Sequence, residues 1–141
     1  MAYKFKAEGI HSANLPQENV KSIKAHTETP RTNDGRGTDT AVTMLVTGAI
    51  RSVDENAIAD ETINLAKWAT EYDEAKAYSK ATATAEASGQ VLRNDIYPNA
   101  FVVSYSEKFD IGAGVGTYEL KLRQKKDLLE GIENTGGYLG A

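Results

Sequence analysis

The chain has 141 residues, no cysteine and a formal net charge of −4. A chain of this length can bury a core without a metal or disulfides, so we expect a single domain over residues 1–141. The absence of cysteine excludes a disulfide framework and a thiolate metal site. The charge lacks the basic excess that supplies most non-specific affinity for nucleic acids, which disfavours specific recognition of DNA or RNA.

Membrane insertion and a cleavable secretory signal are also disfavoured. No run of residues approaches the roughly 20 apolar residues that a membrane-spanning helix needs. Residues 1–6 have no apolar stretch after their basic residues, so we expect them to be folded sequence and not a signal peptide.

The first third of the chain alternates in polarity and then loses its pattern. Residues 3–8 and 22–28 alternate apolar or small residues with polar ones, which predicts two half-buried strands. Residues 29–39 contain Pro30 and Gly35 among polar residues, which favour turns and offer nothing to bury. We therefore expect a long exposed loop there.

Residues 40–51 predict a strand, because Val42, Met44, Val46 and Ile50 share one face at a period of two. The spacing of apolar residues then changes from that of a strand to that of a helix. Apolar residues at positions 65, 68, 69 and 72 follow the spacing i, i+3, i+4 and i+7 of an amphipathic helix.

We expect this helix to pack Leu65, Trp68 and Tyr72 into the core. Asp54 and Asp60 are alternative N-cap residues, since a short side-chain oxygen can accept an unpaired N–H of the first turn. The helix should end near residue 73.

Several further strands follow. Residues 78–87 alternate Ala with Thr or charged residues, and threonine at every second site favours a strand over a continued helix. Turns at 88–90 and 98–99 delimit strands at 91–97 and 101–106. Residues 117–126 predict the last strand, because Tyr, Leu and Leu alternate with charged residues. The tail, 128–141, has too little apolar content to order itself, so we expect this extension to pack on a neighbour or fray.

Motifs for catalysis or cofactors are missing. Gly112, Gly114 and Gly116 lack the spacing of a dinucleotide fingerprint and precede a strand, so they predict a hairpin connection. Neither His11 nor His26 belongs to a cluster with metal-ligand spacing. No serine stands in a nucleophile elbow, and the carboxylates around the helix suit a solvated face. We expect no enzyme, cofactor or metal site.

Charge is unevenly distributed along the chain. Residues 54–74 are rich in acids, whereas residues 121–126 are rich in bases. These opposite surfaces could meet between neighbouring copies. The candidate assembly residues are Lys121, Arg123, Lys125, Lys126, Glu71 and Glu74. The polar faces of strands 80–87 and 117–126 suit either an ordinary solvated surface or a wet channel inside a ring.

The segment from Trp68 to Asp127, a little under half of the chain, resembles the tube proteins of contractile tails and their relatives, the haemolysin-coregulated proteins of type VI secretion. The stretches that carry this resemblance are 65–68 (LAKW), 78–82 (YSKAT), 89–93 (GQVLR), 98–105 (PNAFVVSY), 114–120 (GVGTYEL) and 124–127 (QKKD). Residues 5–10 and 45–50 match more loosely, and the loop at 29–39 has no equivalent.

The resemblance implies a mainly β (α+β) fold, an antiparallel six-stranded β-barrel with one flanking α-helix. It implies hexameric rings stacked into a tube within a sheath, with baseplate and spike proteins as partners and cargo or DNA passing through the lumen. Assembly in the bacterial cytoplasm and presence in a phage tail, virion or extracellular injection particle are also implied. The alternative is a small soluble β-barrel binding or adaptor module.

Overall fold

The computed structural model describes residues 1–29, 40–51, 61–110, 112 and 115–140. Most of the described chain is β-strand. The strands are β1 (Ala2–Glu8), β2 (Ala13–Leu15), β3 (Ser22–Glu28), β4 (Ala41–Ile50), β5 (Ser79–Ala87), β6 (Gln90–Phe109), β7 (Gly116–Gln124), β8 (Glu133–Thr135) and β9 (Tyr138–Leu139). The helical segments are η1 (Gln17–Asn19), α2 (Thr62–Ala69), α3 (Glu74–Ala77) and η2 (Lys126–Gly131). None of the described helices is long and apolar enough to cross a membrane.

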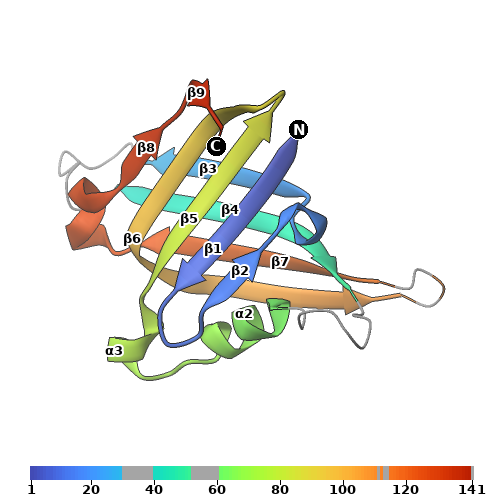
Figure 1. The fold of residues 1–141 in the computed structure, drawn as a ribbon. Coiled ribbons are helices and arrows are strands. Elements are labelled where there is room, and N and C mark those ends of the chain that lie inside the picture. The colour runs from blue at the N-terminus through green and yellow to red at the C-terminus, as the bar shows by residue number, and fades with distance from the viewer. Residues whose placement is uncertain (30–39, 52–60, 111, 113–114, 141) are drawn as a thin grey trace.

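The strands form one antiparallel sheet that folds over on itself. Its order is β2-β1-β5-β6-β7-β4-β3, and β8 and β9 also pair with β6. We call β2, β1, β5 and the first half of β6 the first layer, and the second half of β6 with β7, β4 and β3 the second layer. Figure 1 shows the strands of the first layer crossing those of the second at a steep angle. This is the orthogonal packing of two twisted layers around a shared core.

The six-stranded closed barrel expected from the resemblance is wrong. Among the described residues the path of pairing begins at β2 and ends at β3, and these two strands do not pair with each other. The sheet is therefore open. Because β6 belongs to both layers, the core is enclosed by folding the sheet over and not by joining its edges.

Strand β6 also corrects the predicted turn at residues 98–99. Its first half pairs with β5 and its second half with β7, without interruption. The pairing with β5 jumps from Ala81↔Tyr97 to Ser79↔Ala100, so Pro98 lies in a bulge, where a residue without an N–H is tolerated. The strand bends there and continues into the second layer.

The inner sides of both layers and one helix form the core. Met44, Val46, Leu120 and Leu122 of the second layer have no measurable exposure, and small alanines dominate β5. These positions alternate with polar ones, as the period of two predicted. Strand β3 is the exception: its boundaries are as expected, but six of its seven residues are exposed instead of half-buried.

Helix α2 confirms two of its three predicted core residues. Leu65 and Trp68 are buried, and the Trp68 indole N–H donates to the carbonyl oxygen of Ala77 at 2.7 Å. Tyr72 is 96% exposed, so its predicted burial is wrong. The helix ends at Ala69, before the turn that would have carried Tyr72 back to the apolar side.

The start of α2 differs from both predicted caps. The residue that precedes its first turn is Glu61, whose side chain caps no helix N–H. Its carboxylate instead accepts a hydrogen bond from the backbone N–H of Asn14, at 2.9 Å. Asp54 and Asp60, like residues 30–39 of the expected loop, lie outside the described residues.

The C-terminal tail is ordered against its own chain, which corrects the expectation that it packs on a neighbour or frays. Strand β8 pairs with β6 at Asn94–Ile96, and β9 pairs with it at Gln90 and Val91. The side chains of both short strands are exposed. Backbone pairing with a free edge of β6 therefore places the tail, without the apolar burial that its composition lacks.

Candidate assembly surface

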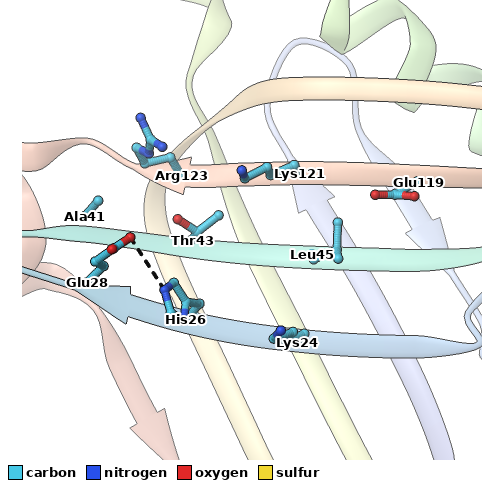
Figure 2. Close-up of a pocket in the computed structure, with 9 residues that line it drawn as sticks. All are labelled: Lys24, His26, Glu28, Ala41, Thr43, Leu45, Glu119, Lys121 and Arg123. Atoms are coloured by element: carbon cyan, nitrogen blue, oxygen red, sulfur yellow. Dashed lines mark ion pairs between the residues drawn. The ribbon is translucent and has the colours of Figure 1, made fainter.

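The outer side of the second layer carries a groove of about 340 Å³, which we call the polar groove. Figure 2 shows that its side chains come from three neighbouring strands, β3, β4 and β7. It is lined by Lys24, His26, Glu28, Ala41, Thr43, Leu45, Glu119, Lys121 and Arg123. The residues that alternate with these along β4 and β7 point into the core. The groove is therefore formed by the outward-pointing residues of the period-two pattern.

Charges in the polar groove are mixed and only partly paired. Lys24, Lys121 and Arg123 supply cations. Glu28 and Glu119 supply carboxylates. The His26 Nε2 atom lies 3.7 Å from a carboxylate oxygen of Glu28. The buried Nε of Arg123 has no hydrogen-bond partner among the described residues. Such a face is suited to water and to mobile polar solutes rather than to a packed apolar partner.

The second layer ends in two edges without a strand partner among the described residues. One is β3, which pairs only with β4. The other is β6 at residues 101–109, which pairs there only with β7. Most side chains of both segments are exposed. Unpaired strand edges are templates for pairing with another chain, so both edges are candidate sites of assembly.

The six predicted assembly residues lie in different places. Lys121 and Arg123 lie in the polar groove. The Lys125 Nζ atom lies 3.7 Å from a carboxylate oxygen of Asp127 and 5.5 Å from the centre of the Tyr78 ring, over its face. Lys126 is exposed at the start of η2. The structure does not bring this basic strand end against the acids of the helix region within one chain.

Glu71 is already engaged within its own chain. Its carboxylate accepts a hydrogen bond from the His11 side chain at 3.0 Å and one from the backbone N–H of Asp73 at 3.2 Å. The hydrogen bond with His11 is the main cause of a lowered Glu71 pKa. Glu74 lies in the exposed first turn of α3. Of the two predicted acids, Glu74 is the one left for another molecule.

Sequence reasoning missed the β3 and β4 side of the polar groove. Lys24, His26 and Thr43 stand at alternating positions in predicted strands, so their outward direction could have been inferred. Their neighbours across the sheet could not, because the pairing of β3 and β7 with β4 joins segments far apart in the chain. No group of three or more His, Asp or Glu among the described residues could hold a metal ion.

Comparisons with known proteins place the fold. No protein-family model matches the chain, and no curated protein matches it in sequence. Among solved structures it is similar to Hcp1 from Flavobacterium johnsoniae, with a TM-score of 0.58 and 14% identity over 100% of both chains. A chain from the sheath–tube complex of the extracellular contractile injection system PVC matches with a TM-score of 0.55 and 11% identity, over 96% of this chain and 89% of that one.

A third similar structure is the SPP1 tail tube, with a TM-score of 0.53 and 12% identity, over 97% of this chain and 78% of that one. The chain therefore has the fold of phage-tail-like tube proteins. Of these structures, Hcp1 is matched along its whole length.

Proposed function

We propose that the chain is a non-catalytic structural subunit of the inner tube of a contractile injection system or phage-like tail. Its copies join into stacked rings, hexameric as the resemblance implies, that enclose a channel. The fold supports this role. The observation that carries the proposal is the second layer, which combines a polar outer side with two free edges.

Strand directions support ring formation through these edges. β3 is antiparallel to β4, β4 to β7, and β7 to β6. It follows that β6 runs antiparallel to β3. If residues 101–109 of one copy add to β3 of the next, the alternation of directions continues unbroken. Repetition then closes a sheet of four strands per copy, which removes every free edge of the second layer.

The polar groove faces the channel in this arrangement. In a closed ring, the outer side of every second layer faces the same way, either toward the channel or away from it. The first layer and α2 cover the other side, so the polar groove lines the lumen. Cargo or DNA would pass along this surface. Sheath, baseplate and spike proteins are the expected partners of the assembled tube, which forms in the bacterial cytoplasm.

Exposed charges outside the polar groove provide further contacts between copies. Lys126 and Glu74 are exposed, and Lys125 directly precedes Lys126 in the sequence. We propose that these charges meet between neighbouring copies. Exposed ion pairs contribute little individually, about 0.2–1 kcal/mol, but a ring repeats every contact.

Light scattering and electron microscopy of the purified chain test the proposal. We expect rings or tubes whose fraction rises with protein concentration. Because the chain has no cysteine, a Lys24→Cys variant combined with Ser104→Cys or Ser106→Cys tests the edge pairing directly. Oxidation should give a ladder of covalent oligomers. A protein that stays monomeric at every concentration and forms no rings would refute the proposed function.

A further inference from the structure

A second hollow lies between the two layers, beside β3. This interlayer cleft has a volume of about 220 Å³. It is lined by Tyr3, Ile23, Ala25, Ala83, Ala85, Arg93 and Asp95. Its walls come from β1, β5 and β6 of the first layer and from β3 of the second. The cleft is thus bordered by the strand whose edge has no partner.

Asp95 places a carboxyl group in this cleft. The residue is 8% exposed. Burial raises the pKa of Asp95, and the positive charge of Arg93 acts in the opposite direction. No hydrogen bond or ion pair joins its carboxylate to another described residue. A carboxyl group that is largely withdrawn from water, with no protein donor, is stabilised by a donor that another molecule brings into the cleft.

Residues of the other free edge carry a matching pair of groups. Tyr105 and Glu107 of β6 stand opposite Leu120 and Tyr118 of β7, so they point to the inner side of the second layer. The Tyr105 hydroxyl donates to the Glu107 carboxylate at 2.7 Å. Glu107 itself is exposed. This edge therefore presents a hydrogen-bonded pair of one hydroxyl and one carboxylate on the side away from the polar groove.

We propose that Tyr105 and Glu107 of one copy close the interlayer cleft of the next: the Tyr105 hydroxyl exchanges its hydrogen bond to Glu107 for one to Asp95, and the released Glu107 carboxylate pairs with Arg93. The inference rests on the proposed function, because the addition of β6 to β3 brings the two edges together. When all polar grooves face one channel, the inner sides of neighbouring second layers are also continuous. Tyr105 and Glu107 then lie on the same side as Ile23 and Ala25, which line the cleft.

Charge complementarity favours a second copy as the occupant. The cleft holds an acceptor inside and a cation at its border, and the opposite edge offers a donor followed two residues later by an anion. Placing Glu107 near Asp95 alone would bring two carboxylates together. Arg93 removes this conflict, because a guanidinium has enough donors for both groups. The pairing is therefore specific to this combination of residues.

Charge reversal at the seam tests the inference. Arg93→Glu and Glu107→Arg should each raise the subunit concentration for half-maximal ring formation by about tenfold or more, since each leaves a like-charged pair at the seam. The double variant should return to within about threefold of the wild type. Glu133→Arg, on the exposed strand β8, is the matched control and should assemble normally.

The outcomes distinguish failure of this inference from failure of the proposed function. If the wild-type chain forms rings while both single variants assemble equally well, the seam contact is refuted and the tube role stands. If the wild type forms no rings, the tube role itself fails. Should a reversed variant melt earlier as a monomer, Arg93→Gln and Glu107→Gln replace it. Normal assembly of these neutral variants, or a double reversal without recovery, would also overturn the contact.

Discussion

Trp68→Ala should destabilise the isolated subunit, because Trp68 is the largest fully buried side chain of the core. Removal of a buried tryptophan leaves a cavity that neighbours fill only in part, at a cost of about 3–5 kcal/mol. The indole N–H bond to the carbonyl of Ala77 is lost as well, which deprives the short connection to β5 of its anchor. We therefore expect a loss near the upper end of this range.

Thermal unfolding followed by circular dichroism measures this loss. A chain of 141 residues should lose roughly 3 °C of Tm per kcal/mol, so the variant should melt roughly 12–15 °C earlier. Tyr72→Ala is the control on the same segment, and it should change the free energy of unfolding by less than about 0.5 kcal/mol because the ring is exposed. A Trp68→Ala variant that melts like the wild type but fails to form rings would refute the core assignment.

Three further predictions concern assembly and pH. Reversing Lys125 and Lys126 to Glu should leave the monomer folded but make ring formation weaker and sensitive to salt, as sedimentation at two ionic strengths would show; normal assembly at physiological salt would contradict it. Backbone amides on the free edge of β3 should gain protection from hydrogen exchange on assembly, whereas those of β7, already paired on both sides, should not change; equal protection in both states would exclude pairing at this edge. The pKa of Glu71 is lowered in the folded chain, so its hydrogen bond with His11 stabilises the fold above pH 4.5. This contribution is lost as the pH falls through the lower pKa of the folded state. Glu71→Gln should therefore flatten the acid limb of the stability curve. An unchanged acid limb in urea titrations would show that the contact does not contribute.

Much of the local structure was predictable because one side of each strand is buried. The alternation along β4 and β7 reports directly which residues enter the core, and both strands lie within a few residues of their predicted ends. Helix α2 was predictable for the same reason, from the spacing of Leu65 and Trp68. Burial of one side of a strand or helix produces a regular spacing of apolar residues in the sequence. This spacing can be recognised without knowing which segment covers that side.

Other features depend on partners that no local pattern encodes. Pro98 predicts a turn in isolation, but pairing of β6 with both β5 and β7 turns the same residue into a bulge within a longer strand. Tyr72 fits the apolar stripe of a longer helix, yet α2 ends before it. The tail is held by backbone hydrogen bonds to β6, which leave its side chains exposed and therefore leave no trace in composition.

The same distinction between local pattern and long-range pairing applies to the candidate assembly surface. That Lys121 and Arg123 point away from the core follows from alternation along one strand, which the sequence by itself determines. That they share a groove with Lys24 and His26, and that Asp95 lies in a cleft beside Ala25, follows from strand order and the fold of the sheet. Side-chain direction is a local property of a strand, whereas neighbourhood across a sheet is decided by long-range pairing, and only the tertiary structure contains it.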